Sequence, residues 1–248
     1  MPSSRLSDVE ALEWLDFRQY MADNWKQGEH VALVAPTGQG KSTFAGGILQ
    51  LRRWCLALDP KGGDDTIDAY GWPRLTKWPL SLKDRHDMRQ GEPVRYVVGG
   101  RGRSPEQRAT RRNLQVRVLQ GVLKDGGWTI YCDDLQTLSD ARFGAAADQI
   151  EELLILARGA KVSVVSAFQR PARVPRAAGD QATYFAVAYT RDVDVVNRIA
   201  EMMGRSAAEM RGAISALGDF KFGWLVVSRN PRDPLILTRP QKLQARTA

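Results

Sequence analysis

Val31-Ala-Leu-Val-Ala-Pro-Thr-Gly-Gln-Gly-Lys-Ser-Thr43 is the stretch that decides the fold. Its apolar first half predicts a buried strand over 30–34, and the glycine-containing stretch 35–40 predicts a loop that leads into a helix. This order, ending in Gly40-Lys41-Ser42, follows the phosphate-binding pattern GxxxxGK[ST]. The backbone N–H groups of such a loop can face phosphate oxygens, and the N-terminus of the helix favours an anion.

The spacing of the pattern assigns a role to individual residues of this loop. Lys41 can neutralise the β- and γ-phosphates of a nucleotide, and the Ser42 hydroxyl can hold Mg²⁺. Ala35 stands where the pattern has its first glycine, but Gly38 and Gly40 remain where the backbone must approach the phosphates. The expected nucleotide contacts are Pro36, Thr37, Gly38, Gln39, Gly40, Lys41, Ser42 and Thr43. ATP and Mg²⁺ are therefore the expected cofactors; an ordinary glycine-rich turn, or a phosphate site without turnover, are the alternatives.

The composition is that of a globular protein with an excess of positive charge. The 248 residues are 43% hydrophobic and 26% charged, with a net charge of +8, which favours an anionic partner such as nucleic acid. The sequence contains neither an apolar run of the roughly 20 residues that span a bilayer nor the apolar core of a signal peptide. Cys55 and Cys132 lie in apolar runs and are expected to be reduced, so a cytoplasmic location is predicted.

Strands and helices are predicted to alternate along most of the chain. The predicted strands are 30–34, 54–58, 94–98, 128–132, 161–167 and 183–190, followed by a closing hairpin or terminal strands at 220–228 and 235–237. The predicted helices are 8–23, 43–51, 83–89, 104–124, 145–158, 192–204 and 206–216. This alternation predicts an α/β fold with a mostly parallel sheet flanked by helices on both faces.

Three segments of unequal size are predicted from this pattern. An N-terminal helical segment, 1–27, packs on the core; residues 28–240 form the phosphate-loop domain, with an elaborated connection at 62–100; and 241–248 form a basic C-terminal tail. The 104–124 helix has a clear start, because Ser104 can cap it and Pro105 suits its first position.

Two further stretches can complete a nucleotide site. The strand 128–132 ends in Asp133-Asp134, the form of a Walker B strand, in which Asp133 can reach Mg²⁺ and Asp134 can orient the attacking water. Aspartate stands at position 134 where related ATPases usually have glutamate, and both carboxylates could instead cap a helix or lie in a solvated loop. Gln169, at the end of the next strand, can sense the γ-phosphate or position water, although an isolated glutamine also suits a surface role.

Together these pieces resemble the FtsK–HerA superfamily of P-loop motor ATPases, whose fold is RecA-like. The resemblance rests on residues 35–42, on 130–134, on 157–171 with its closing Gln169-Arg170-Pro171, and on the Arg/Asp-containing turn at 188–194. It spans residues 28–228. The Gln-Arg-Pro strand is the most selective part, since the phosphate loop is shared by many families.

The resemblance implies a homo-oligomeric ring, commonly a hexamer, that threads double-stranded DNA by ATP hydrolysis. It implies that Lys41, Ser42, Asp133 and Asp134 bind and hydrolyse the nucleotide and that Gln169 is the sensor. Arg158 stands where an arginine finger could reach a neighbouring subunit, with Arg170 as a second choice; a cation at a helix C-terminus is the alternative for Arg158.

The compactness of the chain narrows the biological role that the resemblance suggests. It is similar to the small packaging ATPases of membrane-containing viruses, which adds association with a viral particle to the predicted location. Asp59-Pro-Lys-Gly62 is similar to a strand-end motif of conjugative coupling proteins. Genome packaging, or the transfer of plasmid or chromosomal DNA, is the resulting expectation.

Two arginine-rich stretches are the expected DNA contacts. The first comprises Arg101, Arg103, Arg108, Arg111 and Arg112, and the second comprises Arg173 and Arg176 beside Arg170. Loops of this kind could contact phosphates without reading sequence, and the lack of interleaved aromatic residues favours duplex over single-stranded DNA. Solvated basic loops are the alternative.

Three other functions stay open on the sequence alone. A small GTPase fits the DxxG pattern at 59–62 but lacks a guanine-reading Asn-Lys-x-Asp motif. A small-molecule kinase could use 101–112 as an arginine lid. A nucleotide-binding regulator with little hydrolysis would fit the aspartate at position 134.

Overall fold

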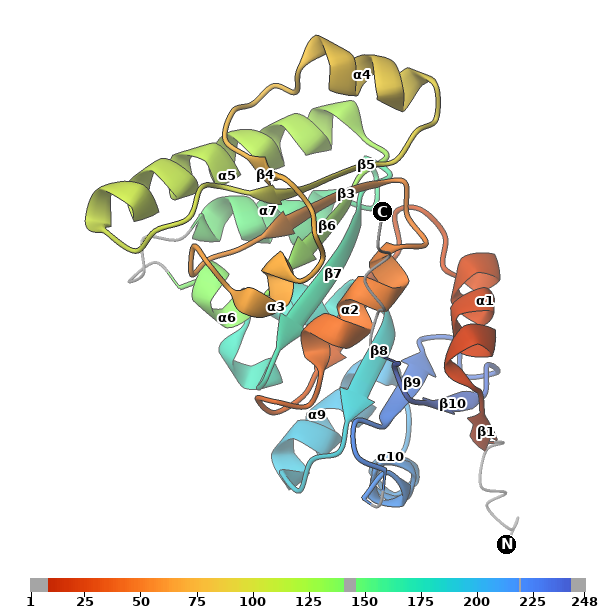
Figure 1. Ribbon diagram of the computed structural model, residues 1–248. Coiled ribbons are helices and arrows are strands. Elements are labelled where there is room, and N and C mark those ends of the chain that lie inside the picture. The colour runs from red at the N-terminus through yellow and green to blue at the C-terminus, as the bar shows by residue number, and fades with distance from the viewer. Residues whose placement is uncertain (1–8, 141–145, 219, 242–248) are drawn as a thin grey trace, which may run out of the picture.

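The computed structural model describes residues 9–140, 146–218 and 220–241. Within these ranges a single sheet of ten strands runs in the order β1-β10-β9-β8-β2-β7-β6-β3-β5-β4 (Figure 1). The strands are β1 (Val9–Ala11), β2 (His30–Val34), β3 (Trp54–Leu58), β4 (Arg74–Leu75), β5 (Val94–Val98), β6 (Thr129–Cys132), β7 (Ser163–Phe168), β8 (Ala182–Ala188), β9 (Trp224–Ser228) and β10 (Leu235–Thr238).

Helices connect most of these strands. They are α1 (Trp14–Asn24), α2 (Lys41–Leu49), α3 (Asp65–Asp68), α4 (Leu82–Arg89), α5 (Pro105–Asp125), α6 (Leu135–Leu138), α7 (Ala147–Leu156), α8 (Arg176–Asp180), α9 (Val193–Met203) and α10 (Ala207–Ala216), with a 3₁₀ turn at Pro171–Arg173. None of the helices in the described ranges combines the length and the apolar character needed to cross a membrane.

The sheet is parallel from β8 through to β4, and β9 and β10 close it as an antiparallel pair. The predicted α/β fold and its terminal strands are therefore confirmed. Because parallel strands end at the same edge, the loops after β2, β7, β6 and β3 lie next to one another in that order. This edge is where ligands bind in open α/β sheets.

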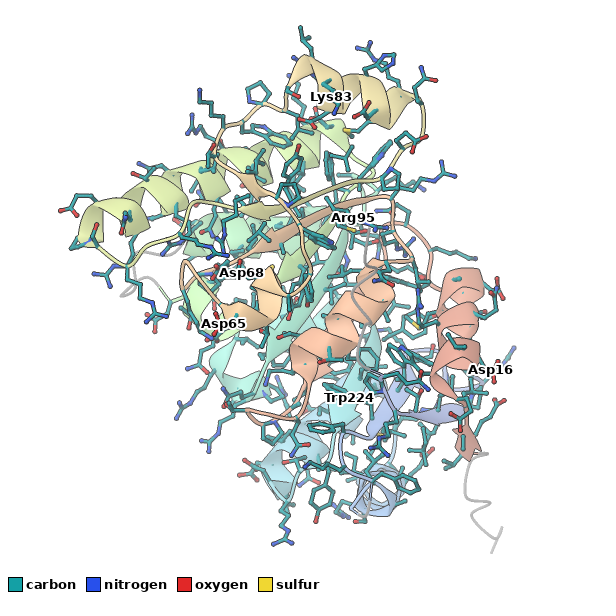
Figure 2. The ribbon with its side chains drawn as sticks, in the orientation of Figure 1. Asp16, Asp65, Asp68, Lys83, Arg95 and Trp224 are labelled. Atoms are coloured by element: carbon teal, nitrogen blue, oxygen red, sulfur yellow. The ribbon has the colours of Figure 1, made fainter. Side chains whose placement is uncertain are left out.

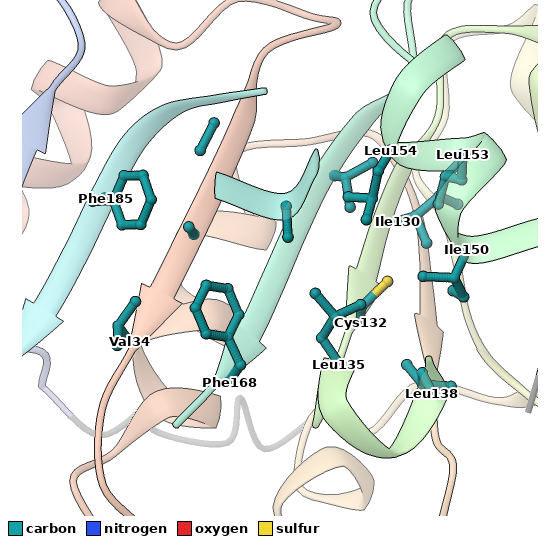
Figure 3. Close-up of a cluster of buried hydrophobic side chains, with 14 of the residues drawn as sticks. Val34, Ile130, Cys132, Leu135, Leu138, Ile150, Leu153, Leu154, Phe168 and Phe185 are labelled. Atoms are coloured by element: carbon teal, nitrogen blue, oxygen red, sulfur yellow. The ribbon is translucent and has the colours of Figure 1, made fainter. Parts of the chain in front are cut away.

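Helices cover both faces of the sheet, as predicted, and each face has its own apolar core. One core gathers side chains of α1, α2 and α3 against the strands, and the other gathers those of α5, α7, α9 and α10. Figure 3 shows part of the second core, in which Ile150, Leu153 and Leu154 of α7 lie over Ile130 and Cys132 of β6. Cys55 and Cys132 are both buried with free thiols.

The N-terminal segment differs from the predicted continuous helix over 8–23. Its first described residues, Val9–Ala11, form an edge strand parallel to β10, and the helix begins only at Trp14. The cause is tertiary, because β10 supplies the hydrogen-bonding partners that make a strand favourable there. The helix packs as expected: the rings of Trp14 and Phe17 lie 5.4 and 5.6 Å from Phe44 of α2.

Local signals decide the other helix starts. At α5 the Ser104 side chain accepts from Gln107 N while the Gln107 side chain accepts from Ser104 N, a complete capping box with Pro105 at the first position. α2 starts at Lys41, two residues before its predicted start. The short elements α3, β4, α6 and α8 were not predicted from the sequence. Residue 145 of the predicted 145–158 helix, and 242–248 of the predicted tail, lie outside the described residues.

Candidate nucleotide-binding site

The loop between β2 and α2 has the backbone that the glycines predict. All five residues of β2 are buried, so the strand holds the start of the loop in the core. Gly38 and Gly40 have φ values of 82° and 79°, in the left-handed region that favours glycine. Gly40 is the N-cap of α2, so the first turn of that helix directs its unpaired N–H groups toward the loop.

Lys41 lies across this loop. Its Nζ donates hydrogen bonds to the carbonyl oxygens of Ala35 at 2.7 Å and Pro36 at 3.0 Å. Burial lowers the pKa of Lys41, while the charges of Asp133 and Asp134 act in the opposite direction. The ammonium group is therefore part of the same electrostatic site as the two carboxylates, although they lie more than 90 residues away in the sequence.

Tyr131 joins Ser42 to Asp133. Its hydroxyl donates a 2.6 Å hydrogen bond to Asp133 Oδ1 and also lies beside the Ser42 side chain. Asp133 is only 6% exposed, and burial raises its pKa despite the hydrogen bond from Tyr131. Tyr70 also contacts Ser42, because its hydroxyl donates to the Ser42 carbonyl oxygen at 2.7 Å.

The donor set at this point suits Mg²⁺. Ser42 and Asp133 offer hard oxygen donors that share the Tyr131 hydroxyl, and a buried carboxylate with a raised pKa gains from a nearby cation. Among the described residues there is no group of three or more His, Cys, Asp or Glu side chains that could hold a metal alone. Mg²⁺ does not need one, since it commonly binds through one or two protein oxygens together with substrate phosphates.

Asp134 adopts a constrained geometry next to this pair. Its φ is 54°, and its side chain caps α6 by accepting from Thr137 Oγ1 at 2.9 Å and Thr137 N at 3.4 Å. Lys61 Nζ lies 3.9 Å from Asp134 Oδ2. The helix-capping alternative is therefore present in the structure, and the water-orienting role stays a prediction.

Gln169 follows β7, the strand between the phosphate-loop strand and the Asp133 strand. Ala35 N donates to Phe168 O at 3.3 Å, so the exposed Gln169 is the next residue along from a direct contact with the start of the phosphate loop. This position suits a sensor. Arg170 is also exposed and begins the turn that leads into Pro171–Arg173.

Arg158 lies at the end of the sheet where the parallel strands begin, opposite the end that carries the phosphate loop. It follows α7, ahead of β7, and its guanidinium donates to Gln181 O at 3.3 Å and Thr183 Oγ1 at 3.2 Å, where β8 begins. The phosphate loop lies at the opposite ends of these parallel strands. Arg158 is therefore not part of the site in its own subunit, and a finger role needs a second copy of the chain.

The loop after β3 adds residues that the sequence analysis did not assign to the site. Lys61 Nζ lies 3.3 Å from Asp64 Oδ2, and the Thr66 hydroxyl lies within hydrogen-bond distance of Ser42 Oγ, at 3.0 Å. Burial would lower the pKa of Lys61, but Asp133, Asp64 and Asp134 together raise it. The signal for this loop was its motif, Asp59-Pro-Lys-Gly62, at the carboxyl end of a parallel strand. Tyr131 also had a signal, because it points to the same face as Asp133 two residues later.

A largely apolar cavity of about 710 Å³ adjoins the phosphate loop at Gly40 and Thr43. Its other side is formed by the segment before β9 and by the end of β10. The large apolar side chains that line it are Leu12, Leu217, Phe220, Phe222 and Leu237. A mostly apolar cavity of this size is typical of small-molecule sites in proteins.

The predicted DNA-contacting arginines divide into two groups. Exposed side chains are found at Arg101, Arg103, Arg108, Arg112, Arg173 and Arg176. Arg111 differs from the expectation, because it is only 3% exposed and its guanidinium donates to Gly102 O at 3.0 Å and Pro60 O at 3.2 Å. The reason is its helical position, on the same face of α5 as the buried Leu114 and Val118. Arg111 therefore supports the surrounding loops from within.

No protein-family model and no curated protein sequence matches the chain. Solved structures do. The genome packaging NTPase B204 of Sulfolobus turreted icosahedral virus 2, in complex with sulfate, is 17% identical with a TM-score of 0.55, and the match covers 86% of this chain and 96% of B204. Other structures of that NTPase are complexes with AMP, AMPPCP and ATP-gammaS.

Two further matches are proteins of other systems. The conjugation coupling protein TcpA of pCW3, with ATPgS, is 12% identical with a TM-score of 0.57 over 88% of this chain and 61% of TcpA. VirB4 of Thermoanaerobacter pseudethanolicus is 13% identical with a TM-score of 0.54 over 86% of this chain and 89% of VirB4. At these identities the likeness establishes the fold alone, and that fold is the RecA-like α/β fold that the resemblance predicted.

Proposed function

We propose that this protein is an ATPase that drives double-stranded DNA through an oligomeric ring. The observation that carries the proposal is that the Tyr131 hydroxyl links Ser42 of the phosphate loop to Asp133, whose charge also interacts with that of Lys41. Exposed arginines of the stretch 101–112 and of the turn 170–176 offer contacts for an anionic polymer. Genome packaging, or the transfer of plasmid or chromosomal DNA, is the proposed role.

Each residue of the site has a defined part in the proposed reaction. The N–H groups of Thr37–Thr43 and the Lys41 ammonium bind the phosphates, and the adjoining apolar cavity takes the base. Ser42 and Asp133 would hold Mg²⁺, which, when bound, neutralises charge on the phosphates. Asp134 orients the attacking water, and Gln169 contacts the terminal phosphate or that water.

The ring is proposed from the position of Arg158. In its own subunit this side chain lies at the far edge of the sheet from the phosphate loop, so a catalytic contact requires a neighbouring copy. Substitution of Arg158 by alanine should remove turnover while nucleotide binding is kept. Full turnover in that variant would reject the finger and shift attention to Arg170.

The DNA contacts are proposed at the exposed arginines Arg101, Arg103, Arg108, Arg112, Arg170, Arg173 and Arg176. Contacts from these side chains to phosphates would be independent of sequence and sensitive to salt. A translocating protein needs this property, because tight reading of one sequence would halt it.

ATP turnover with and without long double-stranded DNA tests the proposal. We expect turnover to rise on addition of DNA, with a smaller rise at high salt. The Lys41→Ala variant should keep its fold and lose turnover. Equal rates with and without DNA, together with phosphorylation of a small acceptor, would indicate a kinase. Nucleotide binding without turnover would indicate a regulator.

A further inference from the structure

The loop that follows β3 lies between the proposed triphosphate site and the first basic loop. We call residues 59–66 the β3 loop and residues 99–103 the basic loop. Asp59 shapes the β3 loop from inside: it is fully buried and accepts hydrogen bonds from the backbone N–H groups of Lys61, Gly62 and Gly63 at 3.0, 2.9 and 2.8 Å. The loop is therefore a folded unit with a fixed centre.

One side of the β3 loop faces the triphosphate site. Lys61 Nζ lies 3.3 Å from Asp64 Oδ2 and 3.9 Å from Asp134 Oδ2, and its charge interacts with that of Lys41. The Thr66 hydroxyl donates to Asp64 Oδ1 and lies 3.0 Å from Ser42 Oγ. A second lysine thus lies close enough to the phosphate-binding lysine for their charges to interact, and it pairs with Asp64 of its own loop and with Asp134 after β6.

The other side of the β3 loop is bonded to the basic loop. Gly102 N donates to Gly62 O at 2.9 Å, and Arg111 connects the two loops from below through Gly102 O and Pro60 O. A Cβ atom at Gly62 would collide with the Arg111 guanidinium and the Gly102 carbonyl, so the two loops are packed without spare room. A shift of one loop must therefore move the other.

Arg74 provides a second connection between the same parts. Its guanidinium bonds to Asp59 at 3.0 Å, to Asp68 at 2.6 Å and to Gly99 O at 3.1 Å. Asp68, labelled on α3 in Figure 2, also pairs at 2.9 Å with Arg101 of the basic loop. The exposed Arg101 is therefore connected to α3, the helix that follows Lys61, through the Asp68 carboxylate.

We propose that Lys61 is a second triphosphate-binding lysine, whose ammonium group exchanges its ion pairs with Asp64 and Asp134 for one with the terminal phosphate of the nucleotide. The resulting movement of the β3 loop then shifts the basic loop. This inference rests on the proposed function. The conformation of the basic loop, which is proposed to contact DNA, would then depend on which nucleotide is bound. A basic loop that holds DNA in one nucleotide state and releases it in the next is what stepwise movement requires.

The present contacts of Lys61 suit such an exchange. Its side chain is 49% exposed, so the ion pairs to Asp64 and Asp134 are solvated and easily replaced. A terminal phosphate carries more charge than one carboxylate and offers three acceptor oxygens to the ammonium group. Lys41 and Lys61 repel one another, and a phosphate group between them would relieve that repulsion.

The first experiment measures binding of fluorescent mant-AMPPNP and mant-ADP by the full-length protein and by Lys61→Ala. We expect the variant to bind mant-AMPPNP about 10- to 100-fold more weakly, the usual loss for a charged hydrogen bond, with mant-ADP affinity little changed. Lys61→Arg should keep most of the preference. Lys77→Ala, at an exposed lysine of another loop, is the matched control and should behave as wild type.

The second experiment follows amide hydrogen exchange in the basic loop. In the wild-type protein the Gly102 amide should exchange at different rates with AMPPNP and with ADP. In Lys61→Ala this difference should disappear, although both nucleotides are present at saturation. Asp64→Asn, which weakens the present partner of Lys61, should not weaken mant-AMPPNP binding.

Three results would overturn the inference. Lys61→Ala could bind both nucleotides as wild type does, it could lose both to the same extent, or the Gly102 amide could respond to the nucleotide without Lys61. Each leaves the proposed ATPase intact, because wild-type binding is still seen. If the wild-type protein bound neither nucleotide, the proposed function itself would fall.

Discussion

The Tyr131 hydroxyl of β6 donates a 2.6 Å hydrogen bond to Asp133, the residue directly after the end of that strand. Because side chains alternate along a strand, both point to the face that carries α2, where Tyr131 also lies beside Ser42. Both residues are buried. Tyr131 therefore fixes the orientation of the carboxylate that the proposed reaction uses and keeps it next to the phosphate loop.

Tyr131→Phe is expected to impair turnover more than folding. Loss of one hydroxyl leaves the buried Asp133 carboxylate with one hydrogen bond fewer, which costs about 1–3 kcal/mol. Loss of a partner that orients a metal ligand typically lowers metal affinity or activity 10- to 100-fold. Steady-state turnover at several Mg²⁺ concentrations measures the effect.

The matched control is Tyr96→Phe. It removes a hydroxyl that bonds to Asp84 at 2.7 Å, a similar pair far from the nucleotide site. It should leave turnover unchanged. If both variants had the same turnover, Tyr131 would have only a structural role.

Asp134→Asn separates the two roles of this residue. Asparagine can still accept from Thr137 and cap α6, but it cannot act as a base. We expect a fall in turnover of about 10²- to 10⁴-fold with nucleotide binding retained. Fluorescence binding and single-turnover hydrolysis give the two numbers. If Asp134→Asn turned over ATP at the wild-type rate, the role of Asp134 would be limited to capping α6.

Much of the site could be predicted because it is local in sequence. The phosphate loop needs one strand, one turn and one helix, and Asp133 and Gln169 each follow a recognisable buried strand. Parallel strands bring their carboxyl ends to one edge, so these three pieces could be placed near one another before any coordinates. The alternation of strands and helices likewise predicted the α/β fold, which the structure confirms.

The features that were missed depend on contacts between distant segments. β1 is a strand because β10 lies beside it, and nothing near Val9–Ala11 indicates this. Lys61 belongs to the site because β3 is the neighbour of β6, and strand order does not follow from local patterns. Arg111 could have been found, since its spacing from Leu114 and Val118 places it on the buried face of α5.

Adjacent arginines on α5 should give opposite results. Arg112 is exposed, so Arg112→Ala should weaken DNA binding slightly and lower the dependence of log Kd on log salt by about one unit, with no loss of stability. Arg111→Ala should instead cost about 1–3 kcal/mol, because buried carbonyl groups lose their donor. Salt titrations of DNA binding and thermal unfolding separate the two. Equal melting temperatures would contradict the buried role of Arg111.

The buried His30 predicts a loss of stability in acid. Burial lowers its pKa to about 4 from 6.5, and the charge of Arg158 adds to the effect. The folded state therefore binds a proton less tightly than the unfolded state. This contribution is complete above pH 6.5 and is lost as the pH falls toward 4, by about 3 kcal/mol in all.

His30→Asn tests this pH dependence. Its side-chain oxygen can accept from Val164 N, as His30 Nδ1 does at 3.2 Å, but it does not titrate. Urea unfolding between pH 7 and 4.5 should show a shallower decline for this variant. His86→Asn, at the exposed histidine of α4, is the control. A parallel decline in all three proteins would assign the acid sensitivity elsewhere.

The central claim is that ATP hydrolysis at this site moves the protein along duplex DNA. Displacement of a third strand from a DNA triplex, at increasing distance from the free end, tests it most directly. The account predicts displacement by the wild-type protein with ATP after a lag that grows with distance, and none with AMPPNP or with Lys41→Ala. Rapid ATP hydrolysis with the third strand left in place would contradict it.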